Sequence, residues 1–420
     1  MSKGNEKMKI FKKCKSGWKT IYLLIFLPPL FYSCSNQNEN KNLTIGFGKA
    51  NLTQAGIYED PITNDQDFKE NLEYAYEEKF GISDRIEGRW RPGSGDARHI
   101  ADSIYVSAMY GEDVNGPWAI VALDEGEIFY ELLDILQYPL IHNLGIPKER
   151  LIFLPSHCHS LPRMNPEKYQ KTVFDAVKQA KDNRSEVEIA SLDLSINGKK
   201  YSVNRRVFVN GIGTHTIMFN DGCKIHDDYL DATENIHDWV ENLGINSSEY
   251  LNPNKKYIAS GEVDDNLQAI LIRDKKSGEM KGSFLRFSSH AVIVSAKMVN
   301  GDVSADFPGY MKRKIENELG GIALFGQGAS GDLRPLNKEY SHQFAKEYGE
   351  NLADQIIQSS KELKWEPLTE LKYYTEPVTL PLMDNLVYSK KEMKKEMGEL
   401  EILYDKETNP WQKRVLQNEF

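Results

Sequence analysis

The chain has 420 residues, of which 40% are hydrophobic, and it carries a formal net charge of −10 at pH 7. This length allows one large domain or two ordinary ones with a substantial buried core. The acidic balance, with no basic stripe beyond the N-terminus, argues against binding to a phosphate backbone, so we expect no nucleic acid as a partner.

The N-terminus is typical of a bacterial secretion signal rather than of a folded element. A lysine-rich head leads into an apolar stretch over 21–32, which is short for a spanning helix and is broken by two prolines. A cysteine and then a polar tract follow directly. We therefore expect a signal peptide over 1–34 with lipoprotein-type cleavage before Cys34, and a polar tether over 35–42. The alternative is a plain signal peptide with an incidental cysteine.

Lipidation of Cys34 would anchor the protein to a bacterial membrane without a spanning helix. The expected location is therefore extracytoplasmic, in the periplasm or on the cell surface. Beyond Cys34 only Cys158 and Cys223 remain, and their spacing leaves open whether they pair. A folded domain is expected over 43–420.

Hydrophobic periodicity in the first half of this domain predicts a strand, a helix and a second strand in succession. The expected elements are a start of folded sequence near 43–48, a charged and turn-rich region at 54–100, strands at 117–123, 150–155 and 187–196, and helices at 125–144 and 166–182. The strand–helix–strand order is that of a βαβ unit. In open α/β sheets, chemistry collects beyond the carboxyl ends of such strands.

The second half continues the alternation after a polar region, and no internal repeat is visible. The expected elements are an irregular insertion at 219–262, strands at 267–273, 283–288 and 322–325, and helices from about 308 and over roughly 338–361. Together these elements predict an α/β fold: a mixed β-sheet core flanked by helices, with a site at the carboxyl ends of strands.

The most informative segment is the apolar strand at 150–155, because it runs directly into Ser156-His157-Cys158-His159. Neutral imidazole is the commonest protein ligand of catalytic zinc. A pair of hydrogen-bonded histidines at the end of a core strand is the plainer alternative. Cys158 lies between the histidines and could be a soft ligand or a nucleophile, but as their neighbour on a strand it should face the opposite side.

Three segments share one plan, in which an apolar strand ends and polar residues or glycines follow: 157–160, 289–290 and 326–334. A hydrolytic zinc needs about three protein ligands and an open position for water. We expect His157 and His290 to supply two of the ligands. His159 is either a further ligand or a group that moves protons near the substrate.

Other candidates carry weaker signals. The glycine-rich loop at 326–331 could offer backbone amides to a developing oxyanion, or it could be a simple tight turn. His215 is the main rival ligand, although a surface histidine is the plainer interpretation. Asn204-Arg205-Arg206 would ordinarily be a solvated charge cluster.

Taken together, these segments resemble the N-terminal catalytic domain of the neutral/alkaline non-lysosomal ceramidase family. The resemblance runs in order from about 43 to 340. The similar segments are Gly46-Phe47-Gly48-Lys49-Ala50-Asn51-Leu52-Thr53, Ser156-His157-Cys158-His159-Ser160-Leu161-Pro162, Asn204-Arg205-Arg206, His290, Ser304-Ala305-Asp306-Phe307-Pro308-Gly309-Tyr310 and the stretch from Ala323 to Pro335. Such ordered motifs are more specific together than any one of them alone.

The resemblance implies a zinc-dependent hydrolase that cleaves the amide bond of a ceramide-like lipid by metal-activated water. It implies that His157 and His290 bind zinc, and that His159 and Arg205 contact the substrate. It further implies that the loop at Gly331-Asp332 borders the scissile bond. The partners would then be a small-molecule or lipid substrate and a membrane reached through the lipid anchor, while the oligomeric state stays open.

Two departures from the family pattern bear on the substrate. Arg334 stands where true ceramidases have a catalytic serine, and its charged fork suits a carboxylate, phosphate or sulfate. The family's remaining ligands, a glutamate and a tyrosine, have no convincing match before Phe420. We expect the domain to be incomplete at its C-terminus, and the alternative is that this member has an incomplete site. The alternative function is a non-catalytic cell-surface protein that binds an anionic glycan or lipid headgroup in the same cleft.

Overall fold

The computed structural model describes residues 43–57, 99–217, 222–294 and 302–369, together with single positions further on. The expected signal peptide, the tether and the lipidation site at Cys34 lie outside the described residues, as does most of the turn-rich region at 54–100. Within the described ranges, no helix combines the length and the apolar character needed to cross a bilayer.

The first half of the domain contains four long strands and two helices. They are β1 (Thr44–Asn51), β4 (Tyr105–Asp113), β5 (Gly116–Leu123), α2 (Tyr130–Leu144), β6 (Leu151–Pro155) and α3 (Pro166–Asp182). The short strands β2 (Gly56–Ile57), β3 (His99–Ile100) and β7 (Arg163–Met164) lie in the connections.

The second half has a similar set of elements. They are β8 (Ser185–Ser195), β15 (Asn266–Asp274), β16 (Met280–Phe287), α6 (Asp306–Leu319), β18 (Ile322–Gln327), α7 (His342–Ser359) and β20 (Glu366–Pro367). The short strands here are β9 (Ser202–Asn204), β17 (Asp302–Val303) and β19 (Leu333–Pro335).

One mixed sheet of nine strands forms the centre of the fold, in the order β18-β16-β15-β8-β1-β4-β5-β6, with β20 paired to β8. The neighbours β5 and β6 are parallel, as are β16 and β18, whereas the other pairs are antiparallel. The predicted α/β fold with a mixed sheet flanked by helices is therefore confirmed.

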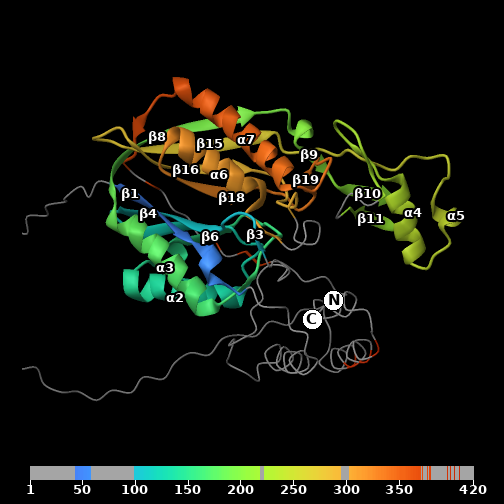
Figure 1. Ribbon diagram of the computed structural model, residues 1–420, viewed down its shortest axis with the longest axis horizontal. Coiled ribbons are helices and arrows are strands. Elements are labelled where there is room, and N and C mark those ends of the chain that lie inside the picture. Colours follow the sequence, from blue (N-terminus) through green and yellow to red (C-terminus); the bar gives the residue numbers. More distant parts are fainter. Residues whose placement is uncertain are drawn as a thin grey trace, which may run out of the picture. The chain divides into compact units, whose positions relative to one another are not determined.

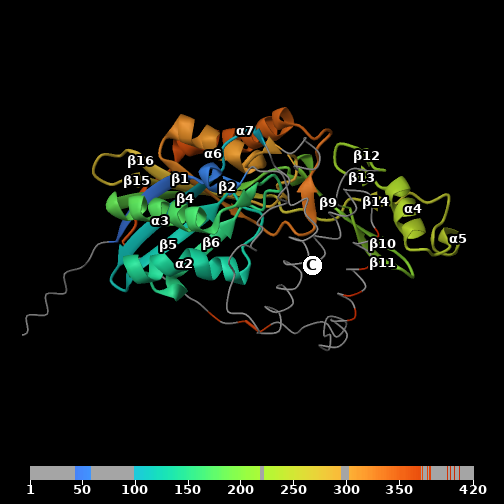
Figure 2. The same cartoon turned by 60° about the horizontal axis from the view of Figure 1, so that its bottom comes forward.

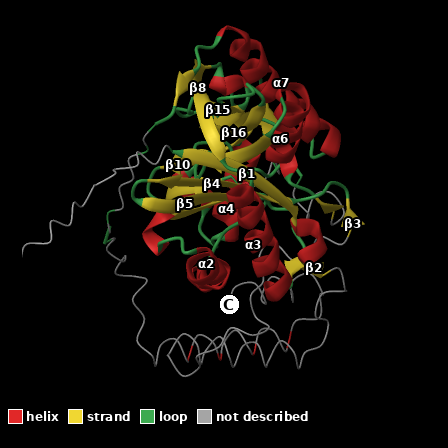
Figure 3. Ribbon diagram, turned by 90° about the vertical axis from the view of Figure 1, so that its left-hand side faces the viewer, coloured by secondary structure: helices red, strands yellow, loops and turns green. Residues whose placement is uncertain are grey.

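The sheet folds over so that its two halves stack face to face (Figure 3). Phe47 of β1, Trp118 of β5 and Leu324 of β18 meet in one buried apolar cluster between them. Helices α2 and α3 cover the outer face of one half, and α6 and α7 cover the outer face of the other (Figure 1). The result is a stack of four layers, helices–sheet–sheet–helices.

The two halves repeat the same order of elements. Strands β4, β5 and β6 form a hairpin followed by a parallel strand that is reached through α2, and β15, β16 and β18 do the same through α6. Each half then adds one more covering helix, α3 or α7. Strand β18 packs against β5 and β6, and a parallel bridge joins the segments that follow β6 and β16, so the carboxyl ends of the two parallel pairs come together.

The Gly-x-Gly of β1 serves packing. A Cβ atom at Gly46 would lie 2.0 Å from the carbonyl oxygen of Ala180, and one at Gly48 would lie 2.0 Å from that of Ala176. Both carbonyls belong to α3, so the missing side chains let this helix lie directly on β1.

Residues 219–262 are more regular than predicted. Together with the hairpin before them they form a lobe of β10 (Arg206–Val209), β11 (Gly213–Thr216), β12 (Lys224–Ile225), β13 (Leu230–Asp231), α4 (Thr233–Asn242), α5 (Ser247–Tyr250) and β14 (Ile258–Ala259) (Figure 2). The lobe has its own buried cluster, in which Ile236 and Val240 of α4 pack against Val207 and Val209 of β10. The expectation of irregular structure was wrong, because short amphipathic elements share one small core; the expectation of an insertion stays a prediction.

Candidate metal centre

The segment after β6 crosses the end of β5 and places the first two histidines. The N–H of Ser156 donates to the carbonyl of Leu123 at 2.9 Å, and the N–H of His157 donates to that of Glu125 at 2.8 Å. His157 then takes a φ of 60°, which a residue with a Cβ adopts at a cost of about 1–2 kcal/mol. Cys158 points into the core and forms no disulfide, so the expectation that it faces away from the histidines is confirmed.

The second half of the domain delivers His290 to the same place. Cys158 and Ala291 form a parallel β-bridge, which joins the segment after β6 to the segment after β16. The N–H of His290 donates at 3.2 Å to the carbonyl of Leu333, the first residue of β19, which follows the glycine-rich loop after β18. The three segments singled out in the sequence therefore meet at one point.

Three imidazole rings converge there, from His157, His159 and His290, with ligand atoms that all lie within 4.8 Å of one another. The Nε2 atom of His157 lies 2.9 Å from that of His290 and 3.4 Å from that of His159. Zinc–nitrogen bonds of about 2.0–2.1 Å in a tetrahedron separate two nitrogen ligands by about 3.3–3.4 Å. The separation of 3.4 Å matches this value and the separation of 2.9 Å is shorter than it, so the three donors are close enough together that they could hold a single small cation.

Hydrogen bonds to the Nδ1 atoms of His157 and His290 orient these two rings. Their Nε2 lone pairs therefore point to the centre of the three-histidine cluster. The Nδ1 atom of His157 lies 2.6 Å from the carbonyl oxygen of Gly126, and the Nδ1 atom of His290 lies 2.6 Å from that of Ser330. Because a carbonyl only accepts, each Nδ1 carries the proton and each neutral ring has a bare Nε2. Two lone pairs 2.9 Å apart repel each other unless a cation lies between them.

The surroundings of His290 favour its neutral form. Burial, followed by the charges of Arg205 and His157, lowers its pKa from 6.5 to about 4. At neutral pH this ring is therefore uncharged, with its one proton on Nδ1 and its Nε2 atom available as a ligand.

Arg205 lies beside the cluster. Its Nη2 atom is 3.4 Å from Nε2 of His290 and donates to the carbonyl of Gly331 at 2.8 Å. Asp332 is held on the other side of this arginine: its backbone carbonyl accepts from the N–H of Arg205 at 2.8 Å, and its carboxylate accepts from Asn204 at 3.1 Å. These contacts place Asp332 next to Arg205 and not among the histidines.

The glycine-rich loop contributes its carbonyl groups to the site. Those of Ser330, Gly331 and Asp332 bind His290 and Arg205. Gly328 is needed for close approach, because a Cβ there would lie 1.9 Å from Oγ of Ser288. Arg334, two residues beyond Asp332, is fully buried and donates to Asn337 and Tyr340.

Sequence reasoning missed Glu125 and Gly126, because it assigned them to the helix at 125–144, whereas α2 begins at Tyr130. Their carbonyls are used by the N–H and the ring of His157, so they are not available to a helix. The same signal that found the histidines, polar residues directly after an apolar strand, could have found them. The Glu125 carboxyl is enclosed, accepts from Tyr169 at 3.1 Å, and has a pKa that burial raises to about 8.

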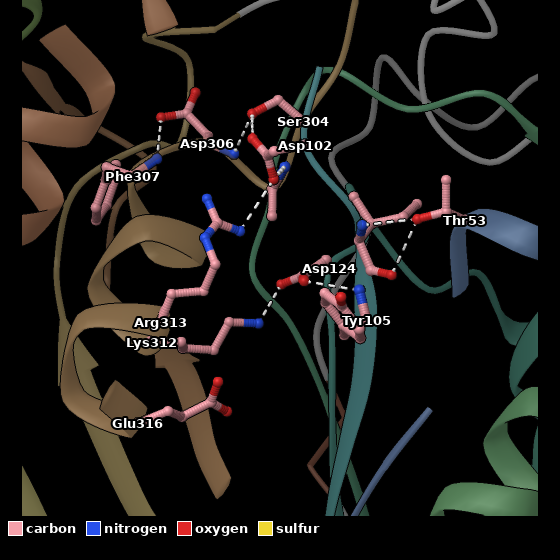
Figure 4. Close-up of polar contacts among 12 residues, drawn as sticks. Thr53, Asp102, Tyr105, Asp124, Ser304, Asp306, Phe307, Lys312, Arg313 and Glu316 are labelled. Carbon is pink, nitrogen blue, oxygen red and sulfur yellow. Dashed lines mark hydrogen bonds and ion pairs between the residues drawn. The ribbon is translucent and has the colours of Figure 1, made fainter. Parts of the chain in front are cut away.

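A buried polar network at the start of α6 holds Val294, four residues after His290, and Figure 4 shows Asp306, Phe307, Lys312 and Asp124 in it. Asp306, at the first turn of α6, accepts from the N–H of Val294 at 2.7 Å and from that of Phe307 at 2.5 Å. Burial raises the pKa of Asp306 to about 7. Next to it, Lys312 of α6 forms an enclosed ion pair with Asp124, at the end of β5, and so ties the second half of the domain to the first.

His215, the rival ligand, lies in the lobe. Its ring stacks on Trp239 with centroids 4.5 Å apart, and its Nε2 atom is 3.1 Å from Oδ1 of Asn235. It does not belong to the histidine cluster found among the described residues.

The fold and the site together define an α/β protein with a three-histidine cluster that could hold a metal ion. The sequence matches no protein-family model and no curated protein. Solved structures similar to it include a ceramidase complexed with C2, with a TM-score of 0.48, and a neutral ceramidase from Pseudomonas aeruginosa, with a TM-score of 0.47. The identity is 15% in both cases, and the match covers 77% of this chain. The chain spans 45% and 46% of the length of those proteins.

Proposed function

We propose that the protein is a zinc-dependent hydrolase, with His157, His159 and His290 as the zinc ligands. The observation that carries this proposal is the convergence of three imidazoles, two of which have their Nε2 lone pairs aimed at each other. Three nitrogen ligands and one open position are the ligand set of a catalytic zinc. Neutral imidazole ligands without carboxylates favour zinc over calcium or magnesium.

His159 completes this set in our proposal. The glutamate and tyrosine ligands that the family resemblance leaves unmatched are therefore not needed to hold the ion. When bound, zinc would polarise a substrate carbonyl and lower the pKa of water.

The residues of the chain would bind and orient the substrate. Arg205 would direct its guanidinium at the oxygen on which negative charge develops, because it lies next to His290 and is fixed by the carbonyl of Gly331. The Gly126 and Ser330 carbonyls would hold two of the rings in their ligand tautomer.

We further propose that the scissile bond is the amide of an N-acylated, ceramide-like lipid, or of a related compound. The sequence motifs shared with the ceramidase family support this choice of bond. A small pocket of about 290 Å³ between α2 and β6 adds a place for an apolar group. Its lining includes Phe153, Leu133 and Pro155, and Pro155 lies two residues before His157.

Metal analysis of the purified full chain tests the proposal. We expect about one zinc per chain in the wild type. His157→Ala and His290→Ala should lose the bound zinc, and His159→Ala should weaken its binding. His142→Ala is the matched control, because this histidine lies exposed on α2 and away from the cluster.

Hydrolysis is then screened on paired N-acyl and O-acyl lipids, with and without a chelator. Turnover that depends on zinc and on His157 supports the hydrolase. A wild-type chain that binds no zinc, or that binds it equally well after His157→Ala, contradicts it. Zinc binding without turnover on either class of lipid would favour the alternative of a non-catalytic binding protein.

A further inference from the structure

Among the residues that the structure describes, no carboxylate pairs with Arg334, which is a fully buried cation. Its side chain is 0% exposed, and its Nη2 atom donates to Oδ1 of Asn337 at 2.8 Å and to the Tyr340 hydroxyl at 3.1 Å. Its Nε and Nη1 atoms have no hydrogen-bond acceptor in the part of the chain that the structure describes. An arginine keeps its charge at any physiological pH, so this burial is costly unless an anion compensates it.

Two other buried cations of the fold are paired with carboxylates. Lys312 forms an ion pair with Asp124, and Arg150 forms one with Asp113 at 2.7 Å. All four of these side chains are at most 8% exposed. Arg334 differs from both cations, because no carboxylate is described at its guanidinium.

Arg334 belongs to β19, which pairs with β9, and the residue that follows β9, Arg205, lies beside His290. Arg334 is paired with Val203, and the ladder continues to Arg205, whose N–H donates to the Asp332 carbonyl. Because side chains alternate along a strand, Arg205 and Arg334 lie on the same face as diagonal neighbours. The charge of Arg334 contributes, after burial, to a lowered pKa of Arg205, which is consistent with this proximity.

We propose that Arg334, together with Arg205, forms a binding site for an oxyanion beside the histidine cluster. The occupant is a carboxylate, phosphate or sulfate, carried by the substrate or bound as a free ion. A guanidinium suits each of these groups, because its N–H donors match their oxygen atoms. The substrate role rests on the proposed hydrolase, whereas binding of the anion does not.

Inorganic phosphate and sulfate are the probes for the site itself. The melting temperature of the full chain is measured in phosphate or sulfate against chloride at equal ionic strength, in the presence of a chelator. We expect both oxyanions to raise the melting temperature of the wild type by several degrees. We expect Arg334→Met to abolish that increase.

Two further variants serve as controls. One removes a different arginine, and the other keeps the positive charge at position 334 but changes the shape of the group that carries it. Arg206→Met removes an exposed arginine of the adjacent β10, and it should keep the full phosphate effect. Arg334→Lys keeps the charge but not the planar fork, and calorimetry should show phosphate binding at least about tenfold weaker. A wild type that gains no stability from either oxyanion, or an Arg334→Lys variant that binds phosphate as tightly as the wild type, would overturn the proposal.

A second arm identifies the occupant by comparing an N-acyl substrate with its phosphorylated analogue. If phosphate raises the KM of the phosphorylated analogue more than that of the unphosphorylated substrate, the site holds a group of the substrate. If phosphate affects the kinetics of both compounds equally, the site holds a free anion. Because the chelated protein is used in the first arm, failure of the zinc proposal does not affect the result for the anion site.

Discussion

His290 should make the metal-free protein less stable as the pH falls from about 6.5 to about 4. Its pKa in the folded protein is lowered from 6.5 to about 4, by burial first and then by the charges of Arg205 and His157. The unfolded chain therefore takes up this proton near pH 6.5, whereas the folded chain takes it up only near pH 4. The contribution of His290 is fully present above this window and is lost as the pH drops through it.

The expected size follows from the shift. The difference between 6.5 and about 4 corresponds to about 3 kcal/mol, because one pKa unit is about 1.4 kcal/mol. The buried carboxyl groups of Glu125 and Asp306 act with the opposite sign, since their pKa values are raised to about 8 and about 7. They favour the folded state at low pH, so the total profile does not isolate His290.

Comparison with His290→Gln isolates the contribution of His290, because this variant keeps the buried carboxyl groups of Glu125 and Asp306. Urea unfolding is followed by tryptophan fluorescence at several pH values across the window, with a chelator present. From the top to the bottom of the window, the wild type should lose about 3 kcal/mol more than His290→Gln. His142→Gln should follow the wild type. If wild type and His290→Gln lose stability in parallel, the pKa of His290 is not lowered and the reasoning is wrong.

Three further predictions concern packing, a buried charge and the N-terminus. Gly328→Ala should lower the free energy of unfolding by about 1–3 kcal/mol, because its Cβ would lie 1.9 Å from Ser288, whereas Gly331→Ala, which has room for a Cβ, should cost less in the same urea titrations. Lys312→Met should cost about 3–5 kcal/mol by leaving Asp124 buried without its cation, and addition of Asp124→Asn should recover part of that loss. Cys34→Ala should move the protein from the membrane fraction to the soluble fraction on cell fractionation, if this cysteine carries a lipid.

The elements that pack by a simple pattern could be predicted from the sequence. The helix expected at 166–182 is α3, Pro166–Asp182, because its apolar face repeats at helical spacing and Asn165 caps its first turn. The strands at 117–123 and 150–155 were found because apolar runs in a sheet covered on both faces are continuous.

Features that depend on long-range packing could not be predicted in the same way. No local pattern shows that the sheet folds over on itself, since its stacking depends on strands far apart in the chain. Nor does composition show that Arg334 is buried while its neighbour on the ladder, Arg205, reaches His290. Local spacing does predict the two histidines after β6, although the contact of His157 with His290 spans 133 positions and needs both halves in place.

The repeated halves of the fold give the histidine cluster an order of assembly. His157 and His159 follow β6 in the first half, and His290 follows β16 in the second. Because the chain is made from its N-terminus, His157 and His159 are synthesised before His290. The three-histidine cluster is therefore complete only after the later strands have docked. Uptake of an ion by all three rings would then report that the whole domain has closed, and a chain that stalled midway would stay unloaded.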